Sequence, residues 1–349
     1  MVREVSWRAA VLLLAFPSLV CYLILLHSAP SLTSHKQTSG EGGSQAAPGD
    51  TSESPGNETS QLLDWWEDWQ GVQARRRSQL RSACIHVNRA RVKTFSRLLI
   101  DRRYLYNLLV DDKHKVIYCY VPKVACTNWK RIMMILSGRS ISTDPLSIRS
   151  DVPHEEGVLT RLSGMSTDLP VLGYKLRTYT KFLLVRHPME RLVSAYRNKL
   201  VRNSTSSTDF KKRFGISILK KYRKGQGHLN ESTSGHGVTF SEFVSYLTDT
   251  GKTNYWSLNE HWAPYLELCH PCTIKYNIIG KYETLEEDAE YILRMIGAPP
   301  SLHFPPIVTS QTASFVSAYL ASLTDTLQRR LYELYKHDFK LFQYDLHNY

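Results

Sequence analysis

The pattern of apolar and polar positions changes several times along this chain. An apolar run, interrupted by Pro17 and Ser18, occupies residues 9–26, and residues 28–60 contain no Phe, Tyr or Trp. From about residue 104 onward, short apolar runs alternate with helical periodicity. Residues 116–121 and 181–185 are rich in apolar, β-branched and aromatic side chains, so they predict buried strands, each followed by a helical pattern. Strands that alternate with helices predict an α/β fold built on a mainly parallel sheet.

The apolar run at residues 9–26 is long enough to cross a thin bilayer, because 18 helical residues rise about 27 Å. Arg3 and Arg8 precede the run, and no further Lys or Arg follows before Lys36. The positive-inside rule therefore predicts a cytosolic tail at residues 1–8, a transmembrane signal anchor and a luminal remainder. A cleaved signal peptide is the alternative, although its apolar core is usually shorter.

Residues 27–60 are predicted to form a disordered luminal stem. Twenty of the 33 residues from 28 to 60 are Ser, Thr, Gly or Pro. Such a segment cannot bury enough apolar surface to offset the entropy lost on ordering. Residues 61–349 would then form the luminal domain. Three glycosylation sequons, at Asn57, Asn203 and Asn230, agree with a luminal address.

Residues 61–103 join an apolar cluster to a basic segment. Leu62, Trp65 and Trp69 belong to the cluster, and ten Lys or Arg residues between Arg75 and Arg103 are opposed by a single acid. We interpret the segment as a solvated helix with an apolar stripe. A basic helix that lines an anionic groove is the alternative.

The charge balance indicates an anionic partner. The chain has 44 Lys and Arg against 32 Asp and Glu, a net charge of +12, and residues 181–224 hold thirteen of these bases and two acids. Nucleic acid, anionic lipid, a nucleotide and an acidic polysaccharide all fit the charge. A luminal address argues against nucleic acid and favours an acidic glycosaminoglycan.

The segment after the first predicted strand has the features of an anion cradle. Pro122 ends the strand, Lys123 follows, and Thr127 or Asn128 can cap the next helix. Free backbone N–H groups and the positive end of the helix dipole would point at this loop. The loop contains no Gly-Lys-Ser/Thr, so it lacks the magnesium-binding hydroxyl of a Walker A motif. An ordinary turn with a solvated lysine is the alternative.

A second strand end carries a matching set of residues. Arg186 follows the strand at residues 181–185, at the carboxyl edge where open α/β sheets bind ligands. Pro188 suits the start of a helix, and Ser194 falls about two turns further on. An arginine and a hydroxyl in these positions can bind a second phosphate.

These segments resemble the donor-binding motifs of Golgi carbohydrate sulfotransferases of the HNK-1-type family, which includes the chondroitin and dermatan 4-O-sulfotransferases. Residues 120–130 are similar to the 5′-phosphosulfate loop, and Arg186-x-Pro188-x-x-Arg191-x-x-Ser194 is similar to the 3′-phosphate motif. The resemblance extends over roughly residues 80–345. It also includes the segments Asn259–Trp262, Leu268–Cys272, Gly280–Glu286 and Tyr332–Phe339. The family more often carries an acid and a Phe where this chain has His187 and Met189.

The resemblance implies a P-loop-like sulfotransferase core in the Golgi membrane that uses 3′-phosphoadenosine 5′-phosphosulfate (PAPS) as donor and needs no metal. The expected acceptor is the 4-OH of GalNAc in chondroitin or dermatan; terminal GalNAc or another glycan is the alternative. The implied donor contacts are Pro122, Lys123, Val124, Ala125, Cys126, Thr127 and Asn128 for the 5′-phosphosulfate, and Arg186, His187, Pro188, Met189, Glu190, Arg191, Leu192, Val193 and Ser194 for the 3′-phosphate. A luminal kinase and a non-catalytic glycosaminoglycan-binding protein are the competing hypotheses. The first is disfavoured by the missing Walker residues, and the second would not need two phosphate motifs.

Three side chains are the candidate catalytic residues. Lys123 would stabilise the charge that develops on the leaving phosphate as the S–O bond breaks. Related sulfotransferases take their general base from the window before the 3′-phosphate strand, so His154 is the first candidate. His261, beside Glu260, is the rival, and a carboxylate is the remaining choice.

The cysteines are predicted to be structural. Cys269 and Cys272, with Cys84 and Cys119, provide enough thiols for two luminal disulfides, whose pairing the sequence leaves open. No second Cys-x-x-Cys completes a zinc site. Cys126, inside the loop, is interpreted as a small packing residue.

Overall fold

The computed structural model describes residues 55–165, 168–223, 233–250, 258–306 and 312–345. The predicted tail, membrane anchor and most of the stem lie outside the described residues, as does the Asn230 sequon. Within the described ranges, no helix combines the length and the apolar character that a membrane span requires.

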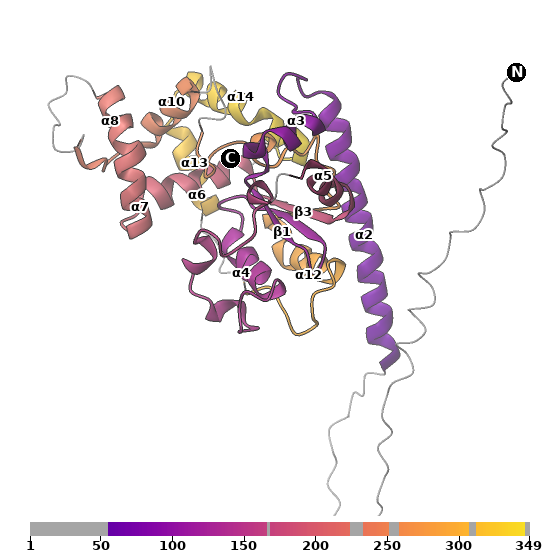
Figure 1. Ribbon diagram of the computed structural model, residues 1–349. Helices are drawn as coiled ribbons and strands as arrows, with labels where there is room; N and C mark the ends of the chain where they lie inside the picture. Colours follow the sequence, from indigo (N-terminus) through magenta and orange to yellow (C-terminus); the bar gives the residue numbers. More distant parts are fainter. Residues whose placement is uncertain (1–54, 166–167, 224–232, 251–257, 307–311, 346–349) are drawn as a thin grey trace, which may run out of the picture. The chain divides into compact units, whose positions relative to one another are not determined.

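A mixed four-stranded sheet lies at the centre of the fold, with the strand order β1-β2-β3-β4 (Figure 1). The strands are β1 (Leu108–Asp111), β2 (Val116–Cys119), β3 (Thr180–Val185) and β4 (Ile278–Lys281). β1 pairs antiparallel with β2, whereas the β2–β3 and β3–β4 pairs are parallel. The α/β fold and the two strands predicted around residues 116–121 and 181–185 are therefore confirmed, and the sheet has one antiparallel pair at its edge.

Helices surround this sheet in the alternating order that the sequence indicates. The α-helices are α2 (Pro55–Ile85), α3 (Phe95–Ile100), α4 (Cys126–Leu136), α5 (Leu169–Thr178), α6 (Pro188–Tyr196), α7 (Thr205–Phe210), α8 (Ile216–Tyr222), α10 (Phe240–Thr250), α11 (Tyr265–Cys269), α12 (Leu285–Met295), α13 (Thr312–Ala321) and α14 (Asp325–Phe342). The 3-10 turns are η1 (Arg102–Leu105), η2 (Pro145–Ser147), η3 (Val152–His154), η4 (Leu162–Gly164) and η8 (Tyr282–Thr284), and the π-helical turns are η5 (Arg197–Val201) and η6 (Lys211–Gly215).

Two long crossovers bring three strand ends to one edge of the sheet. The chain passes from β2 to β3 through α4 and α5, and from β3 to β4 through the segment from α6 to α11. Since β2, β3 and β4 are parallel, their carboxyl ends share an edge. The residues that follow Cys119, Val185 and Lys281 therefore lie together, and this edge positions the candidate site.

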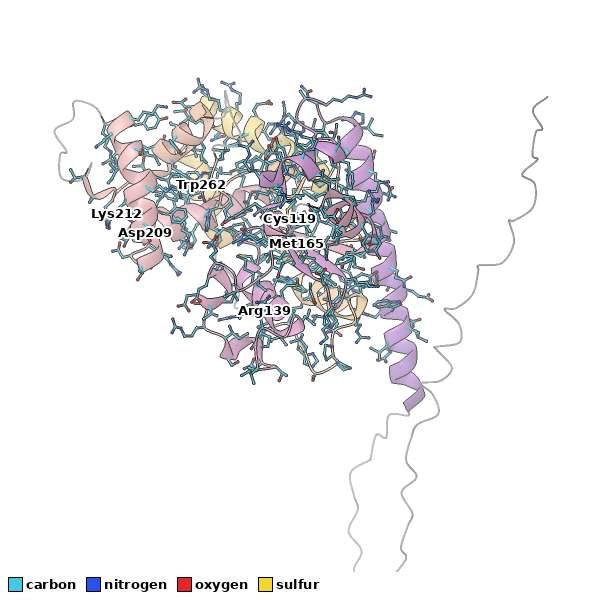
Figure 2. All side chains as sticks on the ribbon, in the orientation of Figure 1. Cys119, Arg139, Met165, Asp209, Lys212 and Trp262 are labelled. Atoms are coloured by element: carbon cyan, nitrogen blue, oxygen red, sulfur yellow. A yellow bond between two sulfur atoms is a disulfide. The ribbon has the colours of Figure 1, made fainter. Side chains whose placement is uncertain are left out.

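Alternate side chains of β2 pack against different layers, as the two-residue period of a strand requires. The Tyr118 ring stacks on Phe182 of β3 at a centroid distance of 4.7 Å, and Trp129 of α4 packs 4.9 Å from Phe182. The next residue, Cys119, forms a disulfide with Cys269 at the end of α11. Figure 2 shows Cys119 in the middle of the packed side chains.

Two disulfides are confirmed, and the structure supplies their pairing. Cys84 at the end of α2 is bonded to Cys272, and Cys119 is bonded to Cys269. The two cysteines of the Cys269-x-x-Cys272 segment are thus bonded to two different parts of the chain, α2 and β2. Cys126 is a free thiol.

Helix α2 covers the outer edge of β4 with polar side chains. The Gln73 amide accepts a hydrogen bond from the Ile279 N–H at 2.9 Å and donates to the Ile279 carbonyl at 3.2 Å. Arg76 donates to the same carbonyl and forms an ion pair of 2.6 Å with the fully buried Asp288. The predicted apolar stripe is present at Leu80, which is buried, but the polar docking of the helix was not expected from its pattern. These polar contacts form hydrogen bonds with backbone groups of β4 that an exposed edge strand would leave unpaired. The helix begins at Pro55, within the segment expected to be stem.

Candidate active site

The loop between β2 and α4 has an unusual backbone. Lys123 has φ 74° and Ala125 has φ 52°, values that non-glycine residues adopt rarely and that often mark functional sites. Ala125 is the N-cap of α4 and gives no side-chain cap. The expectation that Thr127 or Asn128 caps the helix is therefore wrong, because both lie in its first turn. The uncapped N–H groups of this turn are available to an anion.

A cavity of about 540 Å³ opens at this loop. Its wall is made from the β2–α4 loop with the first turn of α4, the end of β3, α6 with the turn after it, and further segments from the α4–α5 connection, the loop before α11, the start of α12 and the chain after α12. The lining residues are Pro122, Lys123, Ala125, Cys126, Thr127, Asn128, Leu146, His154, Arg186, Ser194, Asn198, Lys199, His261, Tyr282, Leu285, Phe304 and Pro306. The cavity thus brings together the candidate residues of both phosphate motifs and both candidate histidines. None of these lining residues is a carboxylate.

Arg186 and Ser194 enter the cavity from β3 and α6. The Tyr265 hydroxyl accepts from the Arg186 N–H at 2.8 Å and donates to the Arg186 carbonyl at 2.9 Å, so this strand end is held firmly. The buried guanidinium forms an ion pair of 2.8 Å with Glu190 and lies 4.2 Å from the centre of the Tyr282 ring. A guanidinium group that is fixed between a carboxylate and an aromatic ring is already oriented to bind a phosphate.

Other residues of the second motif have a structural place. The Arg191 guanidinium, only 1% exposed, donates to the carbonyls of Pro122, Ala263 and Glu260 at 3.1, 2.8 and 2.8 Å. It therefore joins the donor loop to the segment that carries His261, and it does not line the cavity. His187 donates its backbone N–H to Glu283. Outside the cavity wall, the same motif has the buried residues Pro188, Met189, Leu192 and Val193, and Glu190, which binds Arg186. Val124 of the first motif is buried outside the wall as well.

The Lys123 side chain lies among other cations. Burial is the main reason that the pKa of Lys123 falls to about 8, and the cations Lys199 and Arg186 lower it further, against an opposite effect of Cys126. Cations crowded into an acid-free wall favour a ligand with several negative charges.

His154 stands at the mouth of the cavity and is exposed. Its Nε2 lies 3.0 Å from the Thr127 hydroxyl, and its Nδ1 lies 3.3 Å from Lys130 Nζ. Because an ammonium group only donates, Nδ1 accepts from Lys130 and the proton of the neutral ring is on Nε2. Desolvation, followed by the Lys130 and Lys199 cations, lowers the pKa of His154 to about 4. His154 is therefore neutral near pH 7, as a general base must be.

His261 lies deeper in the same cavity. The Asn259 side-chain oxygen accepts from the His261 backbone N–H at 3.1 Å and from its Nδ1–H at 2.8 Å. The backbone bond identifies the oxygen, so Nδ1 carries the proton and Nε2 has a free lone pair. Burial and then the Lys199 and Lys123 cations lower the pKa of His261 strongly. Glu260, a carboxylate alternative, accepts from the Tyr120 hydroxyl at 2.8 Å and does not line the cavity.

The sequence interpretation missed several lining residues, and two of them, Asn198 and Lys199, directly follow the second motif. Asn198 and Lys199 lie in the π-helical turn η5, directly after α6. Lys199 is buried, and its Nζ lies 4.5 Å from the centre of the Phe210 ring. π-helical turns often occur at functional sites, but their shift of register cannot be read from a 3.6-residue period. The available signal was a lysine about one turn beyond Ser194.

The predicted glycosylation sites have mixed positions. Asn203 is exposed, and its side-chain oxygen accepts from Lys211 Nζ at 2.8 Å. Asn57 lies within α2. Their occupancy remains a prediction.

Comparison with known proteins agrees with this geometry. The model of the family described as "Sulfotransferase family" matches residues 106–345. The chain belongs to the sulfotransferase family. Carbohydrate sulfotransferase 11 of Rattus norvegicus is 42% identical over 276 residues, which cover 78% of this chain and 76% of the relative. Carbohydrate sulfotransferase 14 of Danio rerio is 38% identical over 285 residues, covering 79% and 72%. Carbohydrate sulfotransferase 12 of Mus musculus is 40% identical over 290 residues, covering 78% and 68%. No solved structure matches the chain significantly.

A sulfotransferase needs a sulfate donor, and the cavity suits PAPS. Two separated cationic points, Lys123 and Arg186, can each receive one end of a doubly phosphorylated donor. The rings of Tyr282 and Phe304 also line the cavity and offer faces on which a base can stack. Its volume lies in the usual range for small-molecule sites. In the described part of the chain, no group of His, Cys, Asp or Glu is arranged to hold a metal ion.

Proposed function

We propose that this sulfotransferase transfers the sulfuryl group of PAPS to a sugar hydroxyl, and that the hydroxyl is the 4-OH of GalNAc in chondroitin or dermatan. The observation that carries the proposal is the acid-free cavity in which Lys123 and Arg186 stand at the ends of neighbouring parallel strands. The names of the carbohydrate sulfotransferases that are similar to this chain support a sugar acceptor. The resemblance of the two motifs to chondroitin and dermatan 4-O-sulfotransferases supports the position.

The β2–loop–α4 unit acts in this proposal as the P-loop-like core of the enzyme. The N–H groups of the first α4 turn, with Thr127 and Asn128, hold the 5′-phosphate, and Arg186 with Ser194 holds the 3′-phosphate. As the S–O bond to the phosphate breaks, negative charge grows on the bridging oxygen. Lys123 faces that charge and stabilises the transition state more than the ground state.

His154 is our proposed general base. It stands at the open mouth, where the hydroxyl of a long acceptor can approach, and its Nδ1 accepts from the ammonium group of the buried Lys130. Once the hydrogen bond from Lys130 is broken, Nδ1 can take the acceptor proton as the new O–S bond forms. The specific observation in favour of His261 is the free Nε2 that Asn259 orients.

We further propose that the protein is a type II Golgi membrane protein with this domain in the lumen. The support is the apolar run at residues 9–26 with Arg3 and Arg8 before it, and the sequons beyond it. Protease protection and glycosidase digestion of the full-length protein test the topology. A protein whose domain is digested in sealed vesicles, with unmodified sequons, contradicts it.

Transfer of radiolabelled sulfate from PAPS to a panel of desulfated polysaccharides tests the reaction. Disaccharide analysis of the product should find the label at the 4-position of GalNAc. Label at another position, or on terminal GalNAc of glycoproteins alone, overturns the acceptor assignment. Tight binding of ATP without binding of PAPS overturns the donor assignment.

A further inference from the structure

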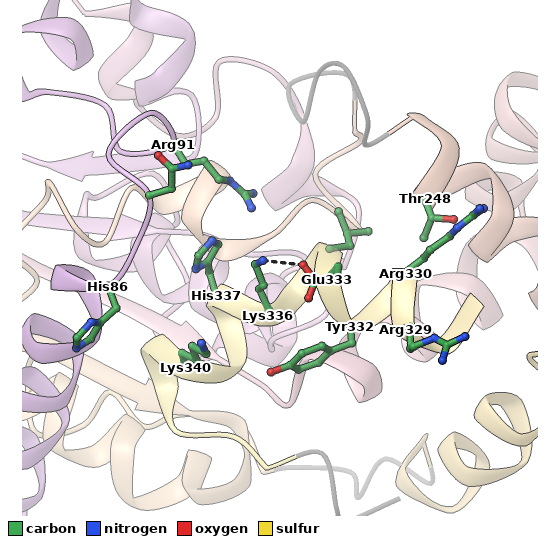
Figure 3. A pocket seen from close by; sticks show the side chains of 12 residues that line it. His86, Arg91, Thr248, Arg329, Arg330, Tyr332, Glu333, Lys336, His337 and Lys340 are labelled. Carbon is green, nitrogen blue, oxygen red and sulfur yellow. Dashed lines mark hydrogen bonds and ion pairs between the residues drawn. The ribbon is translucent and has the colours of Figure 1, made fainter. Parts of the chain in front are cut away.

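A second cavity, of about 870 Å³, lies outside the donor site. Its wall is formed by one face of α14, by the loop that follows α2, and by α10 (Figure 3). It shares no lining residue with the donor cavity. We call it the α14 groove.

The α14 groove is strongly basic. One carboxylate, Glu333, lines it, and Lys336 forms an ion pair of 2.6 Å with that carboxylate. Two histidines, His86 and His337, also line the groove. The cationic lining residues are Arg91, Arg329, Arg330, Lys336 and Lys340. In the part of the chain that the structure describes, Arg329 and Lys340 are exposed and form no ion pair.

The cations are arranged in a row. Arg329, Lys336 and Lys340 are separated by seven and four residues on one continuous helix, so they follow one face of α14. At about 1.5 Å per residue, the row extends roughly 16 Å. Tyr332 lies between the first two cations in the sequence and also lines the groove.

The cations of the groove lower the pKa of a neighbouring side chain, His337. Desolvation lowers the pKa of His337 to about 4, and the Arg91, Lys336 and Lys340 cations are the next causes. Three cations from two separate segments therefore converge on one point of the groove. Arg91 is itself held in place by an ion pair of 3.2 Å with the buried Glu267.

We propose that the α14 groove binds an internal segment of the acidic polysaccharide acceptor, at a distance from the sugar that receives the sulfate. This inference rests on the proposed function, which makes the acceptor a long chain with carboxylates and sulfates along it. Positive charges in a row of about 16 Å match a linear polyanion better than a single phosphate. The walled shape and the Tyr332 ring suit a sugar chain, whereas a flat bilayer surface cannot enter such a groove.

The test compares a long acceptor with a short one. The variant Arg329→Gln/Lys340→Gln removes two exposed cations and keeps good helix formers in α14. Its matched control is Lys113→Gln/Arg139→Gln, which removes one exposed Lys and one exposed Arg elsewhere; Arg139 lies far from α14 in Figure 2. KM and kcat are measured with desulfated chondroitin polymer and with a chondroitin tetrasaccharide, at low and at physiological salt.

We expect the groove variant to raise the polymer KM about 2- to 30-fold, because each exposed ion pair changes affinity by roughly 1.4- to 5-fold. The value of kcat and the tetrasaccharide KM should equal those of the native enzyme. The difference in polymer KM between the groove variant and the native enzyme should shrink at higher salt, because salt screens exposed charges. The control variant should match the native enzyme in all of these values. An unchanged polymer KM, an equal rise for both acceptors, or an equal effect in the control overturns the proposal.

A direct binding measurement separates this proposal from the proposed function. If the native protein binds PAPS but sulfates no chondroitin, the acceptor assignment fails, and fluorescence anisotropy of labelled chondroitin polymer then tests the groove alone. Weaker polymer binding by the groove variant supports the groove, and equal binding overturns it. Loss of binding to phosphatidylserine vesicles with native polymer binding makes the groove a lipid site and also overturns the proposal.

Discussion

Arg186 and Arg191 belong to one sequence motif, but the structure predicts that their substitutions fail in different ways. Arg186 lines the donor cavity and forms an ion pair of 2.8 Å with Glu190. Arg191 lies outside the cavity wall and donates to three backbone carbonyls. Arg186→Gln should therefore act on donor affinity, and Arg191→Ala should act first on the folded state.

The expected magnitudes follow from these contacts. A charge-assisted contact contributes about 1.5–3 kcal/mol, so Arg186→Gln should weaken binding of adenosine 3′,5′-bisphosphate about 10- to 150-fold. Breaking a buried charged network typically costs about 3–5 kcal/mol, so Arg191→Ala should lower Tm by about 5–8 °C for a domain of this size. Arg191→Lys should restore little stability, because a single ammonium group cannot span three carbonyls at fixed positions.

Calorimetry with two nucleotides and thermal unfolding give the decisive comparison. The native enzyme should bind adenosine 3′,5′-bisphosphate more tightly than adenosine 5′-monophosphate. Arg186→Gln should lose that preference, whereas Arg191→Ala should keep it below its melting temperature and should melt early. If Arg191→Ala melts like the native protein and selectively loses the 3′-phosphate preference, our assignment of Arg191 as a structural clamp is wrong. If Arg186→Gln keeps the preference, the 3′-phosphate site is misplaced.

Three further predictions concern the site and its support. The pKa of His154 is lowered to about 4 and the pKa of Lys123 to about 8, so kcat/KM should fall below about pH 4 as His154 protonates and above about pH 8 as Lys123 loses its proton. His154→Ala should remove the acid limb and lower kcat/KM by about 10²–10⁴-fold. If only His261→Ala shows this loss, the general base is His261. Lys199→Met should lower kcat/KM about 10- to 150-fold without lowering Tm, since it removes a buried cation from the cavity; a lower Tm with native kcat/KM would make Lys199 structural. Cys119→Ser/Cys269→Ser should lower the free energy of unfolding by about 2–5 kcal/mol in denaturant titration, because that disulfide closes a loop with a sequence separation of 150 residues; an unchanged free energy would show that packing alone fixes α11.

Local patterns predicted the part of the site that depends on local structure. The runs at residues 116–121 and 181–185 identify β2 and β3, and the alternation with helices indicates parallel strands. A parallel pair brings the residues after both strands to one edge, which places Lys123 and Arg186 in the same cavity. Ser194 follows because it lies on the helix that begins at Pro188.

Long-range polar contacts could not be predicted in this way. Gln73 and Arg76 look like residues of a solvated helix face, and only the position of the edge strand β4 shows what they bind. The pairing of Cys84 with Cys272 likewise depends on where α2 docks. Arg191 is the clearest case, because its motif indicates a phosphate while its three acceptors come from two loops distant in the sequence.

The cations of the donor cavity finally indicate an order of events. The Lys199 cation lowers the pKa values of Lys123, His154 and His261, so a positive charge on Lys199 disfavours the protonated forms of the other three groups. A donor with two phosphate groups among them would favour the charged forms and raise the pKa of His154 toward the range where an imidazole is an effective base. The pH dependence of kcat reports the enzyme with its substrates bound. The pH dependence of kcat/KM, measured at saturating acceptor and varied PAPS, reports the enzyme before the donor binds. The acid limb of kcat should therefore lie at higher pH than the acid limb of kcat/KM. If the two limbs coincide, donor charge does not reach His154, and the base is a group farther from the phosphates.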